Sequence, residues 1–270
     1  MSARPGLDAV IFDAGGTLIR LDFEWMADDL ARRGVVTSPD ALRRAEVAGR
    51  RAYDASGGPA RHGAAQLMWI AAPAANGAGA NGAIGEAPGY RGDIHAYFAG
   101  TLAAAGASDA AIEPAIARFF GRDRERGLWS RPMEGAREAI DALGAMGFRL
   151  AVVSNSDGRA ERHLTHADMR RGVEFVVDSH VVGVEKPDPR IFAIALERLG
   201  VDPARALYVG DIRSVDETGA LAAGMRFVLI DPLGDYAAPG APRIDDMHAL
   251  AQWVDATFER PHAHGGRAPR

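Results

Sequence analysis

The sequence contains no cysteine and only one lysine, Lys186, among its 31 basic residues. The absence of cysteine excludes disulfides, thiolate metal ligands and a cysteine nucleophile. No segment approaches about 18 uninterrupted apolar residues, which argues against a membrane-spanning helix. Residues 1–13 lack the apolar run and cleavage site of a signal peptide. The sequence therefore predicts a cytoplasmic protein with no membrane partner.

Excess positive charge is also absent. The chain carries 36 acidic residues against 31 basic ones, a formal net charge of −5. A general nucleic-acid-binding protein needs clustered positive charge to contact phosphates, so this balance argues against a nucleic-acid partner. A hydrophobic content of 47% with 25% charged residues is typical of globular proteins. The composition does not exclude that the protein forms a homo-oligomer.

Short apolar runs, each ending in a polar residue, dominate the C-terminal half and recur once near the N-terminus. They cover residues 7–13, 148–154, 206–211 and 226–231, with a weaker fifth run at 173–178. Continuous apolar runs of this length are typical of strands buried on both faces of a parallel sheet. They therefore predict five such strands.

Helical patterns alternate with these runs. In residues 192–199, apolar side chains fall at offsets 0, 3, 4 and 7, which is one stripe of a helix. Asp188 followed by Pro189 is typical of a helix start. This alternation predicts an α/β fold with a doubly wound, Rossmann-like parallel sheet.

The first strand is separated from the others by a long stretch with almost no strand signal. We expect residues 1–20 and 128–258 to form a discontinuous α/β core and residues 21–127 to form an inserted α-helical domain. Within the insert, one helix begins at Ser38-Pro39 and ends before Gly57, and others cover residues 92–105 and 109–121.

Two segments carry no site prediction. Residues 71–93 are rich in alanine and glycine and predict a flexible loop. Their G-x-G-x-x-G at residues 77–82 is rejected as a dinucleotide site, because Pro73 precedes it and no helix opens behind it. Residues 259–270 are expected to be a disordered tail.

Polar residues gather where the predicted strands end. Asp13, Ser154-Asn155 and Asp211 follow three of the runs, Asp216 comes five residues after Asp211, and Lys186 precedes a helix. In a parallel α/β sheet these carboxyl ends meet at one ligand-binding edge. Carboxylates, a hydroxyl and an ammonium suit a divalent cation and a phosphoryl group, and oxygen ligands favour Mg²⁺.

These residues lie in four ordered motifs. Residues 13–18 (D-A-G-G-T-L) resemble the first motif, D-x-D-G-T-L, of the haloacid dehalogenase-like hydrolase superfamily. Residues 153–155 resemble its second motif, Lys186 with the following P-D-P its third, and residues 209–216 its fourth. The insert lies where this family has a type-1 helical cap.

The resemblance implies a Mg²⁺-dependent phosphohydrolase acting on a small phosphorylated metabolite. Asp13 would be the nucleophile, forming an aspartyl-phosphate and ligating Mg²⁺ with its other oxygen. The backbone carbonyl of Gly15, the Asp211 carboxylate and Asp216 would complete the protein ligands, although Asp216 could instead be a helix N-cap.

The resemblance also assigns the residues around the phosphoryl group. Ser154 would donate a hydrogen bond to a phosphoryl oxygen, with Asn155 bordering it. Lys186 would hold the charges of nucleophile and phosphate together, and Thr17 would position the loop after Asp13. A serine at a strand end can alternatively act only as a cap.

Gly15 departs from the family pattern, because phosphatases of this family place a second aspartate there as general acid and base. Such catalysis typically contributes ~10²–10⁴-fold, so a slow phosphatase that favours good leaving groups is expected. Gly15→Asp is expected to raise turnover if the new carboxylate takes up the family's geometry.

Three alternatives follow from the same position. A catalytically impaired binding or scaffold protein stays open, and a 2-haloacid dehalogenase is disfavoured by the Gly210-Asp211 pair, which argues for Mg²⁺. A phosphonate hydrolase is excluded because it needs a lysine in the cap, and the only lysine is Lys186 in the core.

The insert gives few indications of a substrate. Basic residues that could contact an anionic substrate or form a solvated face are Arg50, Arg51, Arg61 and His62. His95 is a candidate replacement for the missing acid, because histidine titrates near neutrality. The aromatic residues expected to form the insert's core are Trp25, Trp69 and Phe98.

Overall fold

The computed structural model describes residues 4–56, 93–236 and 240–261. The chain divides into two compact units, one of residues 1–22 and 126–270 and the other of residues 23–125. Several of the predictions concern residues outside these ranges. They are the predictions for the loop at 71–93 up to residue 92, for Arg61, His62 and Trp69, and for residues 262–270. Among the described residues, no helix is both long and apolar enough to cross a membrane.

The first unit is built on a six-stranded sheet in which all neighbouring strands run parallel, in the order β5-β4-β1-β6-β7-β8. The strands are β1 (Ala9–Phe12), β4 (Arg149–Ser154), β5 (Phe175–Asp178), β6 (Ala206–Gly210), β7 (Arg226–Ile230) and β8 (Arg243–Ile244). The predicted α/β parallel sheet is confirmed, and β1 lies between β4 and β6 despite its distance in sequence.

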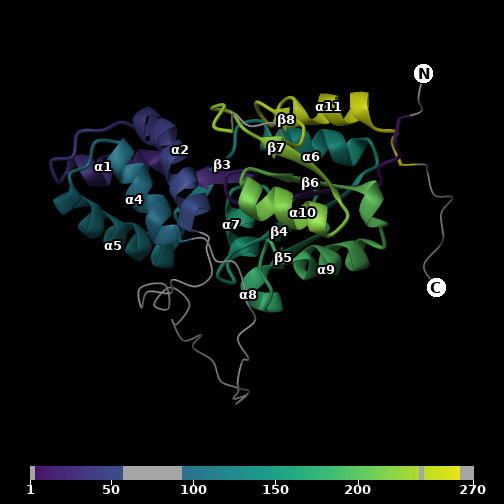
Figure 1. The fold of residues 1–270 in the computed structure, drawn as a ribbon, viewed down its shortest axis with the longest axis horizontal. Coiled ribbons are helices and arrows are strands. Elements are labelled where there is room, and N and C mark those ends of the chain that lie inside the picture. The colour runs from purple at the N-terminus through teal and green to yellow at the C-terminus, as the bar shows by residue number, and fades with distance from the viewer. Residues whose placement is uncertain (1–3, 57–92, 237–239, 262–270) are drawn as a thin grey trace, which may run out of the picture. The chain divides into compact units, whose positions relative to one another are not determined.

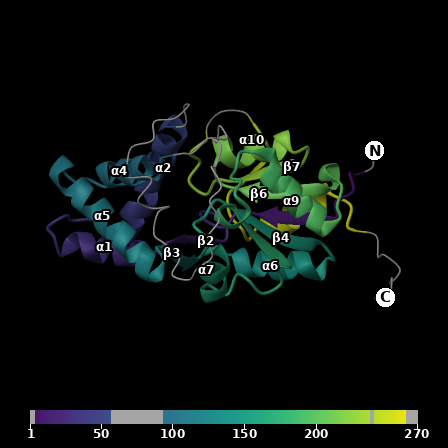
Figure 2. The same ribbon diagram turned by 90° about the horizontal axis from the view of Figure 1, so that it is seen from below.

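Helices cover both faces of this sheet (Figures 1 and 2). The helices are α6 (Ala136–Ala145), α7 (Ala160–His166), α8 (Ser179–Val182), α9 (Pro189–Leu199), α10 (Thr218–Ala222) and α11 (Leu250–Thr257). Val10 and Phe12 of β1 join a core with α6, α7 and α11, whereas Ala9 and Ile11 join a core with α9 and α10. Because both faces of β1 are buried, its sequence shows no polar alternation.

Helix α9 illustrates how local sequence sets the helix ends. The Asp188 side chain accepts a hydrogen bond from the backbone N–H of Arg190 (2.9 Å), as the predicted N-cap requires. Gly200 ends the helix at a φ of 62°, a conformation that glycine adopts without a steric penalty. Two short helices also lie in this unit, Pro203–Arg205 and Arg213–Glu217.

An antiparallel pair of short strands was not expected from the sequence. It joins β2 (Ile19–Leu21) to β3 (Trp129–Pro132), with Leu21 opposite Trp129. Neither strand contains a continuous apolar run, because β2 reads I-R-L and β3 reads W-S-R-P, which is why sequence patterning missed them. The two-residue strand β8 was missed for the same reason.

The second unit is helical. Its helices are α1 (Phe23–Ala31), α2 (Pro39–Ser56), α4 (Ile94–Ala104) and α5 (Asp109–Arg126). Phe98 is fully buried, with ring centroids 5.7 Å from Phe119 and 5.8 Å from Phe120 in edge-on contacts. Trp25 also packs edge-on against Phe119 at 6.0 Å. These aromatic contacts form the core of the unit.

Helices α2 and α4 approach each other closely at two glycines. A Cβ built on Gly49 would lie 2.1 Å from Thr101 Oγ1 and 2.6 Å from the Tyr97 carbonyl oxygen. A Cβ on Gly100 would lie 2.9 Å from the Ala48 carbonyl oxygen. The two backbones can pack this closely because neither glycine has a side chain.

These contacts predict opposite effects for the same substitution at two helical glycines. Gly49→Ala should lower the free energy of unfolding by about 1–3 kcal/mol, because its methyl group overlaps α4. Gly121→Ala in α5 should raise it by about 0.5–1 kcal/mol, because a Cβ there meets nothing within 4 Å and alanine favours helix. Urea unfolding followed by circular dichroism measures both. A Gly49→Ala variant at least as stable as the parent would contradict this packing.

Candidate active site

The Lys186 side chain is almost completely buried, with 2% of its surface exposed, and its ammonium group has three hydrogen-bond acceptors. Nζ donates to Asp13 Oδ1 (2.6 Å), to Asp216 Oδ1 (2.8 Å) and to the Tyr208 hydroxyl (3.0 Å). An ammonium carries three N–H donors, so these contacts use all of them. The only lysine of the chain is thus fixed between two carboxylates.

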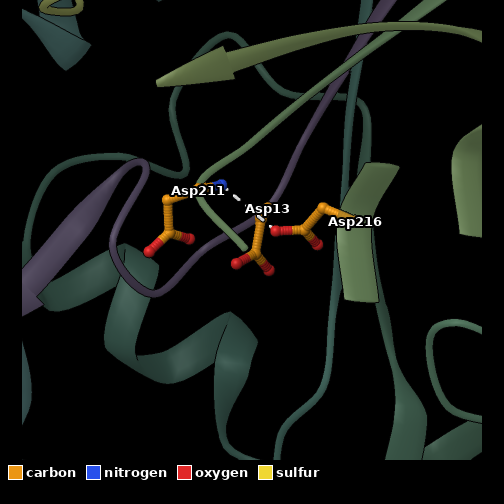
Figure 3. A group of neighbouring side chains, drawn as sticks. All are labelled: Asp13, Asp211 and Asp216. Atoms are coloured by element: carbon orange, nitrogen blue, oxygen red, sulfur yellow. Dashed lines mark hydrogen bonds between the residues drawn. The ribbon is translucent and has the colours of Figure 1, made fainter. Parts of the chain in front are cut away.

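The structure brings Asp13, Asp211 and Asp216 together (Figure 3). Asp13 follows β1 and Asp211 follows the adjacent strand β6. One carboxylate oxygen from each of the three residues lies within 4.8 Å of the others, and all three residues are buried. Asp216 Oδ2 accepts the backbone N–H groups of Asp211 (3.1 Å) and Ile212 (3.0 Å). Asp216 therefore holds the loop after β6 as well as contacting Lys186.

Two glycines leave room for these carboxylates. A Cβ on Gly16 would lie 2.2 Å from Asp211 Oδ2, and Gly16 has a φ of 81°, which favours glycine. A Cβ on Gly210 would lie 2.6 Å from the Asp216 carboxyl group. The glycines of the first and fourth motifs thus let the acidic side chains pack against the backbone.

The site has an excess of negative charge. Burial raises the pKa of Asp13 to about 6, an effect that Lys186 opposes and Asp216 adds to. Burial alone would lower the pKa of Lys186, but Asp13 and Asp216 hold it well above its usual value. Three ionised carboxylates and one ammonium leave a buried net charge of −2, which a divalent cation would neutralise. The all-oxygen donor set of Asp13, Asp211 and Asp216 fits a hard cation such as Mg²⁺.

Asn155 contacts the main chain of Lys186 on both sides of its amide group. Its Nδ2 donates to the Lys186 carbonyl oxygen (2.9 Å), and its Oδ1 accepts the Lys186 backbone N–H (2.7 Å). The amide therefore holds the main chain of the lysine loop against the end of β4. Ser154, the last residue of β4, is buried beside it.

Thr17 lies in the loop after Asp13 and is fully buried. Among the described residues, its hydroxyl oxygen has no hydrogen-bond partner. An unpaired buried hydroxyl is unfavourable unless a ligand supplies the missing partner.

Tyr208, a residue of β6 that contacts the Lys186 ammonium, was not predicted from the sequence. Its hydroxyl donates to the Val153 carbonyl oxygen (2.8 Å) while accepting from Lys186. Burial raises its pKa well above the usual value, so the phenol stays protonated. A hydroxyl-bearing side chain inside the otherwise apolar run A-L-Y-V-G was the one signal in the sequence.

The basic candidates of the second unit have partners within that unit. Arg50 is buried and forms an ion pair with Glu46 at 3.6 Å. His95 Nε2 lies 3.0 Å from Glu113 Oε2. Arg51 is exposed on α2. These contacts do not test whether Arg50 and Arg51 bind an anionic substrate or whether His95 replaces the missing acid, so both stay predictions.

A cluster of buried carboxylates beside a fixed ammonium would suit phosphoryl transfer. Comparison with known sequences shows which family the chain belongs to. A model of the haloacid dehalogenase-like hydrolase family, described as hydrolases, matches residues 7–224. The chain therefore belongs to the haloacid dehalogenase-like hydrolase family.

Individual relatives match over part of the chain. Haloacid dehalogenase-like hydrolase domain-containing protein 3 of Mus musculus is 35% identical over 159 residues, 58% of this chain and 63% of its own length. Phosphoserine phosphatase of Thermus thermophilus is 37% identical over 153 residues, 54% of this chain and 59% of its own. The match thus spans less than two thirds of the length of these curated relatives.

The fold also matches solved structures. A crystal structure of a dehalogenase with an intermediate complex aligns with a TM-score of 0.58 at 20% identity, covering 95% of this chain and 99% of the other. At this identity the likeness concerns the fold alone.

The raised pKa of Asp13 predicts how stability depends on pH in metal-free protein. Between pH 4 and 6 the folded state retains a proton that the unfolded state has lost, so the parent loses stability as pH rises. Asp13→Asn removes this ionisation. The unfolding free energy of this variant minus that of the parent should therefore increase from pH 4 to pH 6 and level off above that.

Urea unfolding in a chelator at several pH values measures this difference. Asp245→Asn, at an exposed carboxylate, is the matched control and should show no such trend. A difference between Asp13→Asn and the parent that does not increase from pH 4 to pH 7 would contradict the raised pKa of Asp13.

Proposed function

We propose that the chain is a Mg²⁺-dependent phosphohydrolase that acts on small phosphorylated metabolites through an aspartyl-phosphate on Asp13. The observation that carries this proposal is the 2.6 Å contact between Asp13 Oδ1 and the buried ammonium of Lys186. This contact orients one carboxylate oxygen and leaves the other to act as nucleophile. The phosphatase named among the relatives supports the same reaction class.

The protein's own groups account for phosphoryl capture. An Asp13 oxygen attacks phosphorus, the bond from phosphorus to the leaving oxygen breaks, and the leaving group keeps the electron pair. Lys186 balances the charge of the Asp13 carboxylate, and the hydroxyls of Ser154 and Thr17 donate to phosphoryl oxygens. Water then attacks the aspartyl-phosphate and Asp13 leaves as a carboxylate.

Four groups would hold Mg²⁺: the carboxylates of Asp13, Asp211 and Asp216 and the backbone carbonyl of Gly15. When bound, the cation would neutralise phosphoryl charge that a single ammonium cannot balance.

Residues 1–20 and 128–258 would form the catalytic core. The inserted helices of 21–127 would serve as a cap that selects the substrate.

A second candidate function rests on Gly15. With no acid–base side chain at this position, a binding or scaffold protein that keeps the fold and the cation site is the alternative. The intact set of Asp13, Lys186 and Asp211 favours catalysis, because a decayed site would be expected to lose more than one of these residues.

Turnover of an aryl phosphate tests the proposed function. We expect hydrolysis that requires Mg²⁺ and that Asp13→Asn abolishes, because the amide is not a nucleophile. Asp245→Asn again serves as the control and should keep parental turnover. Activity that survives in Asp13→Asn would contradict the nucleophile. A parent that hydrolyses neither phosphate esters nor phosphate anhydrides in a broad panel would favour the binding protein.

Lys186→Arg tests the role of the compact ammonium. Nζ makes three contacts of 2.6–3.0 Å in a closed pocket, and the wide planar guanidinium does not occupy the same space. We expect the variant to lose most of its kcat despite its conserved charge. The control is Arg190→Lys, at an exposed position paired with Asp188, which should keep parental turnover. Near-parental kcat in Lys186→Arg would contradict this assignment.

A further inference from the structure

Trp129 lies against Gly15, two residues after the proposed nucleophile. A Cβ built on Gly15 would be 3.1 Å from Trp129 Cδ1 and 3.2 Å from Nε1. Gly15 does not have a positive φ, unlike Gly16, so its backbone would accept a side chain. The obstacle to a residue at position 15 is therefore the indole ring and not the main chain.

The indole has little freedom to move away. Trp129 is the first residue of β3, pairs with Leu21 of β2 and packs against the core that contains Phe12 and α6. The carboxyl group of an aspartate extends beyond its Cβ, so an aspartate at position 15 would need the indole ring to shift. Gly15 and Trp129 thus form a complementary pair, in which one residue is small because the other occupies its space.

In the described part of the first unit, Lys186 and Tyr208 beside Asp13 already donate all of their protons to other groups of the protein. The three N–H groups of Lys186 are used by Asp13, Asp216 and Tyr208, and the Tyr208 hydroxyl donates to Val153. An indole N–H donates hydrogen bonds but does not ionise near neutral pH. A leaving group must then depart from phosphorus without receiving a proton from these residues.

We propose that the Gly15–Trp129 pair selects acyl phosphates of small carboxylic acids as substrates and disfavours alkyl phosphate monoesters. This inference rests on the proposed function. An Asp13 oxygen bonds to phosphorus, the bond from phosphorus to the acyl oxygen breaks, and the carboxylic acid leaves as a stable carboxylate that needs no proton. Substrate and aspartyl-phosphate are both mixed anhydrides of a carboxylic and a phosphoric acid, so the transfer exchanges bonds of similar energy.

Hydrolysis of the aspartyl-phosphate, the second step, also balances in atoms and charge. Water supplies the oxygen of the new bond to phosphorus, and Asp13 leaves as a carboxylate. Both protons of the water go to inorganic phosphate, which releases one to solvent according to pH. An alkyl phosphate ester reacts less readily in the first step, because its alkoxide is a poor leaving group unless it is protonated.

The test is the ratio of kcat/KM for acetyl phosphate to kcat/KM for glycerol 2-phosphate. Both substrates are assayed on one preparation, so the fraction of folded enzyme cancels. We expect a ratio of at least ~10² in the parent, the lower end of what general acid–base catalysis contributes. A parental ratio below about tenfold, with turnover still dependent on Asp13, would overturn the inference and leave the proposed function standing.

Variants test the part played by Trp129. Gly15→Asp alone should leave the ratio within about threefold of the parent, because the ring blocks the new carboxylate. Gly15→Asp combined with Trp129→Ala should lower it at least about tenfold, by giving an acid room to protonate the alkoxide. Trp253→Ala, which removes a partly buried indole from α11, is the matched control and should not change the ratio.

Two results would overturn the role of Trp129: a ratio lowered as much by Gly15→Asp alone as by the double variant, or a ratio unchanged in the double variant. If neither substrate is turned over in an Asp13-dependent manner, the proposed function fails and the inference fails with it.

Discussion

The bridge that the Lys186 ammonium forms between Asp13 and Asp216 is the contact on which the rest of the site depends. Burying an ammonium is unfavourable unless its protons and its charge are fully paired. Here each proton has an acceptor, at 2.6, 2.8 and 3.0 Å. The acceptors belong to the loop after β1, to the short helix Arg213–Glu217 that follows β6 and to β6 itself, so one side chain joins the segments of two neighbouring strands.

Two further sets of contacts keep this bridge in place. Asn155 holds the main chain of Lys186 through two hydrogen bonds, and Asp216 accepts two backbone N–H groups of the loop after β6. Both acidic and basic groups are therefore fixed before any ligand arrives, as electrostatic preorganisation requires. Three glycines serve the site in different ways: Gly16 and Gly210 make room for carboxylates, whereas Gly15 makes room for Trp129.

Much of the fold and of the acidic cluster could be predicted from the sequence, because both depend on local patterns. Apolar runs identified five of the six strands of the parallel sheet, and the polar residues after them meet at the edge that a parallel sheet dictates. Tyr208, the amide clamp of Asn155 and the contact of Trp129 with Gly15 depend on side-chain directions between elements distant in sequence, which no periodicity records. The short β2–β3 pair, which positions Trp129, was not predicted because neither of its strands contains a continuous apolar run.

The proposed function depends on one covalent step, the transfer of the phosphoryl group to Asp13. Peptide mass spectrometry after acid quenching of the protein with acetyl phosphate and Mg²⁺ tests it most directly. We predict the added mass of one phosphoryl group on the peptide that contains Asp13, and its absence from Asp13→Asn. A phosphoryl group found on another residue, or turnover with none trapped on Asp13, would contradict the account.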